Sequence, residues 1–486
     1  MNEIKLEKKL SSKIKDNNNN KINIEIPKTI PIKNFIYENK NKITLDSLKD
    51  GKRIFYNKTE ISEYNENDSE FNTNFIEFRQ LLFENLLLTE DLKDNSKNEK
   101  KTIESALFST FVYDSEFIEP MISVFKLPTI IIRHEQNNYK YNRMDENGQY
   151  IKFIFPKIEY TLKWGCFHSK LMLLKFPNFL RIVVPTANLT NCDWYFWGQI
   201  IWFQDFPLKS ENKKLTIEEE KESEKFLNYL KNFLQTFMPH TYEGKRFWLD
   251  LNINLENYDY SNSAVDLIAS ANGRFNTKNN NNNFGIDRIN NLIKTKYKNY
   301  NKNSNMIIQC SSIGKTIKKK FFDDFYSSFN LINNPSIEIL YPTINYINSF
   351  PLGNELSSCL FLDSVAYNNH KNKFKIIELK KKYEKLKTVF HSKFFITGFK
   401  DKNGDFNINN ESLLYFGSHN FSAAAWGNYE KNNTQISMSN YELGILFNSN
   451  KLNLYEKKNI FNSIILNVNS NFYKENEDEP FLNFFN

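Results

Sequence analysis

One short motif occurs twice in this chain, and the duplication limits what the chain can fold into more than any other feature. Each copy has a histidine and a lysine two residues apart, then an asparagine, and a tryptophan six residues after the asparagine. The members are His168, Lys170, Asn188 and Trp194 in the first copy and His391, Lys393, Asn420 and Trp426 in the second. The matched order predicts two duplicated halves that meet at a pseudo-two-fold axis. One shared site would then hold two imidazoles, two ammonium groups and two amides.

Length and composition set further bounds. A chain of 486 residues with 40% hydrophobic residues has material for two or three packed domains. Its 64 basic and 57 acidic residues leave a net charge of +7, which permits a nucleic-acid partner without establishing one. The four cysteines show no paired spacing, so we expect reduced thiols and no zinc site. No apolar run approaches the roughly 20 residues of a membrane span, so we expect a nuclear or cytosolic protein without a membrane partner.

Apolar runs near both motifs are short and rich in β-forming residues, which predicts strands. They cover residues 171–176, 180–184, 199–203, 394–397, 413–416 and 443–447. Several are apolar at nearly every position, as is typical of central strands covered on both faces. Thr216 and Glu219 form a capping box ahead of apolar residues at helical spacing, which predicts a helix packed on a sheet.

These elements indicate an α/β protein with two domains, each a mixed β-sheet flanked by helices. Residues 1–50 are expected to form a disordered tail, because they are rich in Asn and Lys and lack a periodic apolar pattern. The first domain is expected over residues 51–250 and the second over residues 251–486. Pro239 and a polar stretch place the boundary near residues 240–260.

The residues of the motif suit the chemistry of phosphate esters. A catalyst must neutralise the charge of the phosphate oxygens, supply a nucleophile and protonate the leaving group. Lys170 and Lys393 supply positive charge, and Asn188 and Asn420 supply amide donors. One histidine can attack phosphorus while the other protonates the departing oxygen and then activates water. Two ammonium groups already neutralise the phosphate, so neither a metal nor another cofactor is expected, and symmetry leaves the two histidine roles open.

The spacing of the motif fits a strand. Residues two apart in a strand project to the same face, so each histidine and its lysine can point into one cleft. Leu171 and Leu173 would then face the core. Each asparagine follows a second predicted strand, whose end can bring it alongside.

At these residues the chain resembles the tyrosyl-DNA phosphodiesterases, a branch of the phospholipase D superfamily. Around the two motifs the resemblance is carried by Thr186-Ala187-Asn188-Leu189, Asp193-Trp194, Gly198-Gln199, Ser418-His419-Asn420-Phe421-Ser422, Ala425-Trp426-Gly427 and Tyr441-Glu442-Leu443-Gly444. Weaker matches are Gly273-Arg274-Phe275, Ser311-Ser312-Ile313-Gly314 and Tyr341-Pro342. The phospholipase branch has an Asp five residues after the lysine. This chain has Lys175 and Gly398 there, which argues against a phospholipase.

The resemblance implies a phospholipase D-like fold and an activity in DNA repair. The reaction would be hydrolysis of the bond between a DNA 3′ phosphate and tyrosine, which is left when topoisomerase I stalls. The implied partners are single- or double-stranded DNA with 3′-tyrosyl or other 3′-blocking adducts, and the topoisomerase I-derived peptide. We expect a monomer in the nucleus.

The resemblance also assigns residue roles by position. His168 would be the nucleophile, through a covalent phosphohistidine, and His391 the general acid and later the base. Lys170, Lys393, Asn188 and Asn420 would bind the phosphate. Gln199 and Glu442 carry over as partners of the histidines, and we expect Glu442 to pair with His168 and Gln199 with His391, because a carboxylate on one ring nitrogen strengthens the other as a nucleophile. The alternative is that these two only satisfy nearby backbone groups.

Three further residues are expected to bind the substrate. Ser311 and Ser312 follow a predicted strand, where small residues let backbone N–H groups approach a DNA phosphate, although an ordinary turn would look the same. Trp164 lies four residues before His168, where the family carries an aromatic that stacks on DNA, and a buried core tryptophan is the alternative. Arg274 is expected to help build the second domain and to pair with a carboxylate.

Three other functions compete with this interpretation. One is another phospholipase D-superfamily nuclease or phosphodiesterase. Another is an inactive DNA-end-binding module, against which the complete set of motif residues argues. The last is a scaffold whose repeats only pack together, which would not explain polar residues among apolar strands.

Overall fold

The structure is a computed structural model that describes most of the chain between residues 54 and 482. The described residues are 54–60, 75–82, 103–125, 127–134, 142–144, 150–162, 164–210, 212–238, 250–278, 283–297, 300, 304–314, 317, 319–329, 337–350, 352–384, 386, 388–447, 464–474 and 477–482. The predicted tail, residues 1–50, lies outside them.

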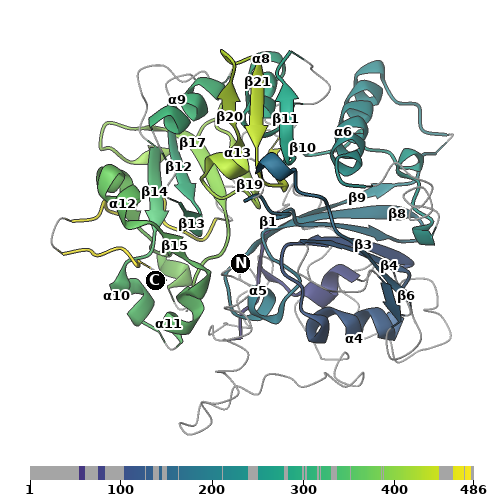
Figure 1. The fold of residues 1–486 in the computed structure, drawn as a ribbon, viewed down its shortest axis with the longest axis horizontal. Coiled ribbons are helices and arrows are strands. Elements are labelled where there is room, and N and C mark those ends of the chain that lie inside the picture. Colours follow the sequence, from purple (N-terminus) through teal and green to yellow (C-terminus); the bar gives the residue numbers. More distant parts are fainter. Residues whose placement is uncertain are drawn as a thin grey trace, which may run out of the picture.

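A mixed sheet forms the first half (Figure 1). In the described residues its strands lie in the order β2 (Phe75–Ile76), β1 (Ile54–Asn57), β9 (Ile200–Pro207), β8 (Phe179–Pro185), β7 (Leu171–Lys175), β3 (Ser105–Thr110), β4 (Thr129–Arg133), β6 (Tyr150–Ile154) and β5 (Asn142–Met144). Strands β3, β4 and β6 are joined in parallel, whereas β3, β7, β8, β9 and β1 are joined antiparallel.

A second mixed sheet repeats this topology. Its main path is β10 (Val265–Ser270), β22 (Glu442–Phe447), β19 (Leu414–Gly417), β17 (Phe394–Lys400), β12 (Asn305–Gln309), β14 (Ile337–Tyr341) and β16 (Phe374–Ile376), and β18 (Phe406–Asn407) pairs with β17. The order β1-β9-β8-β7-β3-β4-β6 recurs as β10-β22-β19-β17-β12-β14-β16, with the same sense at each pairing. The predicted duplication and fold class are therefore confirmed, and each of the six predicted strands is present with its ends shifted by a few residues.

Two smaller sheets and a set of helices complete the described chain. The small sheets pair β11 (Gly273–Asn276), β21 (Gln435–Met438) and β20 (Asn428–Glu430), and β13 (Ser312–Ile313) with β15 (Phe361–Leu362). Helices of the first half are η2 (Phe78–Leu82), α4 (Ser115–Phe125), η4 (Tyr160–Leu162), α5 (Asn191–Tyr195), α6 (Ile217–Gln235) and η5 (Leu255–Asn257). Those of the second half are α8 (Gly285–Thr295), α9 (Lys319–Ser328), α10 (Ile344–Asn348), α11 (Gly353–Leu356), η7 (Ser357–Cys359), α12 (Ser364–His370), η8 (Lys371–Lys373), η9 (Lys381–Tyr383) and α13 (Ala423–Trp426). No helix in this described part combines the length and apolar character needed to span a bilayer.

The hydrophobic core runs across the junction of the halves. Successive residues of β7 face opposite sides of its sheet. Leu171 and Leu173 belong to a core that continues into the second half, whereas Met172 and Leu174 pack with residues of α4 and η2. Figure 1 shows α4 and α6 on opposite sides of the first sheet. Burial on both faces explains why β7 is apolar at nearly every position.

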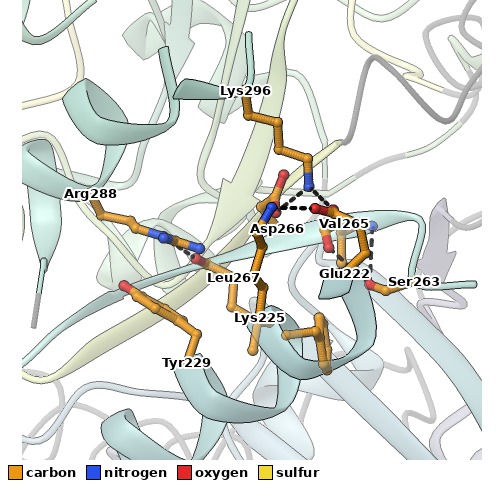
Figure 2. Close-up of a pocket in the computed structure, with 10 residues that line it drawn as sticks. Glu222, Lys225, Tyr229, Ser263, Val265, Asp266, Leu267, Arg288 and Lys296 are labelled. Atoms are coloured by element: carbon orange, nitrogen blue, oxygen red, sulfur yellow. Dashed lines mark hydrogen bonds and ion pairs between the residues drawn. The ribbon is translucent and has the colours of Figure 1, made fainter. Parts of the chain in front are cut away.

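Helix α6 also joins the two halves, and it begins with the predicted capping box at Thr216 and Glu219. Its Glu222 carboxylate lies 2.7 Å from the Lys296 ammonium of the second half, which lies 2.9 Å from Asp266 on β10 (Figure 2). These side chains line a small cavity together with Arg288, whose guanidinium stacks on the Tyr229 ring. We interpret this cavity as part of the packing of α6, because its lysines pair with acids and the Arg288 guanidinium lies over the Tyr229 ring.

Candidate functional site

Both histidine motifs lie in extended segments at the junction of the halves. Residues 168–170 immediately precede β7, and residues 391–393 immediately precede β17. The expectation that the motifs lie within strands is therefore wrong by a few residues. Pairing within each sheet starts just after the lysine, because the segment before it pairs with the other half.

Isolated bridges tie each motif to the opposite half. They pair Phe167 with Tyr441 and Phe390 with Gly198. The backbone N–H of His168 donates to Tyr441 O at 2.9 Å, and that of His391 donates to Gly198 O at 3.0 Å. The residue that follows each bridge partner, Glu442 or Gln199, is thereby carried to the histidine of the other half.

His168 contacts the carboxylate of Glu442. Its Nδ1 lies 2.8 Å from Glu442 Oε2, which is the expected pairing. The Ser418 hydroxyl donates to the same oxygen, and Asn440 Nδ2 donates to Oε1 at 3.0 Å. Glu442 is fully buried. Since a carboxylate only accepts, Nδ1 carries the proton and Nε2 is left with a lone pair.

His391 has a carboxylate partner that the sequence reasoning missed. Its Nδ1 lies 3.0 Å from Asp193 Oδ1 and 3.2 Å from Gln199 Nε2. The Gln199 amide nitrogen is a donor, and it donates to Asp193 Oδ1 at 2.6 Å. Gln199 therefore lies beside His391 as expected, but Asp193 is the group that accepts the imidazole proton.

Asp193 is held in place by several donors. It is fully buried in α5, whose N-cap Thr190 donates to Asp193 Oδ2 at 2.9 Å, and Asn188 Nδ2 lies 3.2 Å from the same oxygen. A usable signal was present in the sequence. Thr190 and Asp193 have the spacing of a helix N-cap pair, and Ala425 stands where the second copy would carry the equivalent acid.

The two carboxylates differ in their tendency to ionise. Burial would raise the pKa of Asp193, but its hydrogen bond to His391, with support from Asn188 and Lys170, lowers the pKa to about 2. Burial raises the pKa of Glu442 above its ordinary value despite the opposing charge of Lys170. Asp193 is thus the more firmly ionised of the two.

The two lysines are fully buried beside the histidines. Lys170 Nζ donates to His168 O at 2.8 Å, and Lys393 Nζ donates to His391 O at 2.6 Å. The charge of Lys170 acts on Asp193 and on Glu442. Because these carboxylates are the partners of the two different histidines, both motifs belong to one site.

The two asparagines are held by equivalent segments. Asn188 Oδ1 accepts from the backbone N–H groups of Phe111 at 3.2 Å and Val112 at 3.4 Å. In the second half Asn420 Oδ1 accepts from the backbone N–H of Ser312 at 3.1 Å and the hydroxyl of Ser311 at 3.3 Å. With the carbonyl oxygens occupied, the amide nitrogens face the ligand position as donors; Asn188 Nδ2 donates one of its two hydrogens to Asp193, which leaves the other for a ligand.

The predicted substrate-binding residues fall in two places. Ser311 follows β12, Ser312 begins β13, and both contact Asn420, so they lie beside the second motif. Trp164 is 85% exposed, which rules out the alternative of a buried core tryptophan. It lies in the segment that leads to His168.

The other residues singled out in the sequence contact groups of the protein itself and have a structural role. Trp194 and Trp426 are buried, and the Trp194 indole donates to Asn188 O at 2.9 Å. His419 is buried between Tyr415 and Ser270, and burial lowers its pKa to about 3. Arg274 pairs with Glu159, as expected of a partner for a carboxylate.

Comparison with known proteins gives a consistent result. The model of the tyrosyl-DNA phosphodiesterase family matches residues 59–482. Tyrosyl-DNA phosphodiesterase 1 of Arabidopsis thaliana is 25% identical over 370 residues, which cover 71% of this chain and 56% of that protein. The matched region thus spans little more than half the length of that relative.

Solved structures with the same fold include a yeast tyrosyl-DNA phosphodiesterase. It has a TM-score of 0.61 and 16% sequence identity, over 89% of this chain and all of that chain. A mutant of the yeast enzyme gives a TM-score of 0.60 at 15% identity, over 88% of this chain and 99% of that one.

Proposed function

Because the chain belongs to the tyrosyl-DNA phosphodiesterase family, we propose that it hydrolyses the phosphodiester bond between a DNA 3′ end and tyrosine. The observation that carries this proposal is the crossed arrangement of the two histidines. Each is bonded through Nδ1 to a buried carboxylate of the other half, Glu442 for His168 and Asp193 for His391. Two catalytic imidazoles with fixed tautomers are what a two-step displacement at phosphorus requires.

Lys170 and Lys393 neutralise the charge of the phosphate. Both ammonium groups are buried, where water screens them little, so their attraction for a bound phosphate is strong. Asn188 and Asn420 add amide donors. Their carbonyl oxygens are occupied by backbone N–H groups, which fixes the amide orientation before substrate binds.

In the first step His168 Nε2 attacks phosphorus and the bond from phosphorus to the tyrosine oxygen breaks. Protonated His391 gives its proton to that oxygen, so tyrosine leaves as the neutral phenol. In the second step His391 takes a proton from water, the oxygen attacks phosphorus, and the phosphorus–nitrogen bond breaks. The products are a DNA 3′ phosphate and free His168, with His391 protonated again.

The two carboxylates support this division of roles. Asp193, whose pKa is lowered to about 2, is fully ionised at neutral pH and stabilises an imidazolium on His391, as a general acid needs. Burial raises the pKa of Glu442, so it holds the Nδ1–H tautomer of His168 with less bias toward the imidazolium, as a nucleophile needs.

The substrate class follows from the family and from the surroundings of the site. We infer a DNA strand with a 3′-tyrosyl adduct or another 3′ block, including a topoisomerase I-derived peptide, and action in the nucleus. Ser311 and Ser312 would contact the DNA phosphate near Asn420. Trp164, which is exposed, would stack on a base.

A turnover assay tests the proposal. The protein is incubated with a 3′-phosphotyrosyl oligonucleotide in EDTA, and release of the 3′-phosphate oligonucleotide is followed. We expect multiple turnovers at a rate that the chelator does not change. Loss of activity in EDTA would overturn the metal-independent mechanism, and tight binding without turnover would indicate a DNA-end-binding module instead.

A further inference from the structure

The segment that carries Trp164, described at residues 159–162 and 164–166, belongs to the first half but is attached to the second. The backbone N–H of Glu159 donates to Asn272 Oδ1 at 2.6 Å, and the backbone N–H of Cys166 donates to Asn440 Oδ1 at 3.3 Å. We call these residues the Trp164 segment. Its two ends are thus fixed on loops that follow β10 and precede β22.

The C-terminal end of the Trp164 segment is tightly packed at Gly165. A Cβ atom added to Gly165 would lie 1.8 Å from Ser439 O and 2.9 Å from Asn272 Nδ2. Only glycine fits between these atoms, so the residue after Trp164 is pressed against the second half. Exposure of the indole therefore does not result from a segment that stands away from the protein.

Arg274 holds the start of this segment. It lies on β11 of the three-stranded sheet above the junction of the halves (Figure 1). Its Nη1 donates to Glu159 Oε1 at 3.0 Å and to Thr161 Oγ1 at 2.7 Å, and its Nε lies 3.7 Å from Glu430 Oε2. Because the guanidinium is rigid and bonds two side chains of one segment, it fixes both the position and the orientation of that segment.

The exposure of this ion pair indicates that its main effect is not on fold stability. The Arg274 and Glu159 side chains are 36% and 42% exposed, and ion pairs at such positions add little to stability. Their effect on geometry is larger, because the pair holds the start of the Trp164 segment, which leads to His168.

We propose that Arg274 is a positioning residue for DNA, which rests on the proposed function. Together with Glu159 it holds the Trp164 segment on the second half, so that the indole is presented to a base of the bound strand at a set place beside the phosphate. The free protein then already holds the Trp164 segment in place, so DNA binding does not have to order it and loses less conformational entropy. We call the contacts of Arg274 with Glu159 and Thr161 the clamp. Loosening the clamp should weaken binding of a DNA strand more than it slows the chemical step.

A competing role for Arg274 is direct contact with a DNA phosphate. The two roles differ at Glu159. If Arg274 bound phosphate directly, Glu159→Gln would free the guanidinium, remove a negative charge and leave binding equal or stronger. If Arg274 acts through the segment, Glu159→Gln replaces the ion pair by a neutral hydrogen bond and leaves the Thr161 contact, so it weakens binding, but less than Arg274→Ala does.

The experiment compares Arg274→Ala, Glu159→Gln, Trp164→Ala and the Arg274→Ala/Trp164→Ala double variant. Lys231→Ala, which removes a surface ion pair with Glu256, is the matched control. Affinity for a single-stranded oligonucleotide with a 3′ phosphate is measured by fluorescence anisotropy at fixed salt. KM and kcat are measured on the corresponding 3′-phosphotyrosyl oligonucleotide.

We expect Arg274→Ala to raise Kd and KM about tenfold, within the range for loss of one stacked base, and Glu159→Gln to raise both about threefold. In each variant kcat should change by less than about twofold. The double variant should bind no more weakly than Trp164→Ala. Unchanged or tighter binding by Glu159→Gln, or additive losses in the double variant, would overturn the proposal. If the wild-type protein bound DNA without turnover, the proposed function would fail while the binding data still decided the role of Arg274.

Discussion

The two halves of the molecule share one framework and differ in the residues around it. In each, a histidine and lysine precede a central strand, and an asparagine follows the next strand. A hydroxyl two residues before that asparagine contacts the residue sent to the opposite histidine. Thr186 donates to Gln199 at 2.6 Å, and Ser418 donates to Glu442. Under the proposed function, this repetition would let the two halves hold one phosphate from two sides.

The halves differ at three matched positions, and the first is Gln199 and Glu442, which follow the equivalent bridge partners Gly198 and Tyr441. Asp193, five residues after Asn188, has Ala425 as its equivalent after Asn420. Phe111 is equivalent to Ser311, because the strands before them pair in the same register with strands that follow the two histidines. Under the proposed function, the repeated residues would bind the phosphate and the residues that differ would set the two histidine roles. Ser311 and Ser312 place small hydroxyl groups in the second half only.

The largest effect that would separate the halves is expected from His168→Ala. Removing the nucleophile should lower kcat by about 10³-fold or more and abolish any covalent intermediate. Quenched-flow turnover and denaturing gels would measure both. Persistence of a covalent adduct in this variant would contradict the assignment.

Asp193→Asn tests the carboxylate beside His391, which has Ala425 as its equivalent in the second half. The His391 imidazolium would lose its ionised partner, so kcat should fall about 10- to 100-fold and the alkaline limb of its pH profile should move to lower pH. Asp405→Asn, an exposed acid in the second half, is the control. A pH profile of unchanged shape would show that Asp193 has no part in protonating the leaving group.

The pKa shifts predict opposite pH dependences of stability for the two carboxylates. The pKa of Asp193 is lowered to about 2, so its contribution is complete above the ordinary value of 3.8 and is lost as the pH falls toward 2, on the order of 2 kcal/mol. The pKa of Glu442 is raised from 4.5, so its ionisation costs stability as the pH rises above 4.5.

Urea unfolding of Asp193→Asn and Glu442→Gln between acid and neutral pH measures these slopes. The stability lost in Asp193→Asn should grow from pH 2 to pH 4. The difference between Glu442→Gln and wild type should shift in favour of the variant above pH 4.5. If the free energy of unfolding changed with pH in the same way in both variants, Asp193 and Glu442 would not differ in their ionisation.

The smallest effect is expected from the hydroxyl groups of the second half. Ser311→Ala removes one contact to Asn420 and leaves the Ser312 backbone donor, so KM should rise about threefold. Ser312→Ala keeps its backbone donor and should have a smaller effect. Equal losses in both variants would mean that the serines act on DNA directly rather than through Asn420.

Much of the fold was predictable from sequence, because the duplicated motif also duplicates the strand pattern. The strands around it were found from their apolar runs, and the start of α6 was found from its capping box. The bridges across the junction were not predicted. Each joins two residues far apart in sequence, and periodicity within one segment carries no information about such a pairing.

The site was predictable where the repeat is exact. The pairing of Glu442 with His168 followed from the family pattern, but Asp193 was missed because it has no counterpart in the second copy. The exposure of Trp164 could not be decided from spacing, since a tryptophan in a short irregular segment has no periodic face to assign. The partner of Arg274 lies in the other half, beyond the reach of local patterns.

The most direct test of the account is to locate the covalent intermediate. His391→Asn should allow attack by His168 but slow the second step, so that a DNA adduct accumulates after mixing with a 3′-phosphotyrosyl oligonucleotide. Digestion and mass spectrometry would then identify the modified residue. We predict a single adduct, on His168. An adduct elsewhere, or none while the variant still turns over, would contradict a site in which two halves hold one phosphate between a nucleophile and an acid.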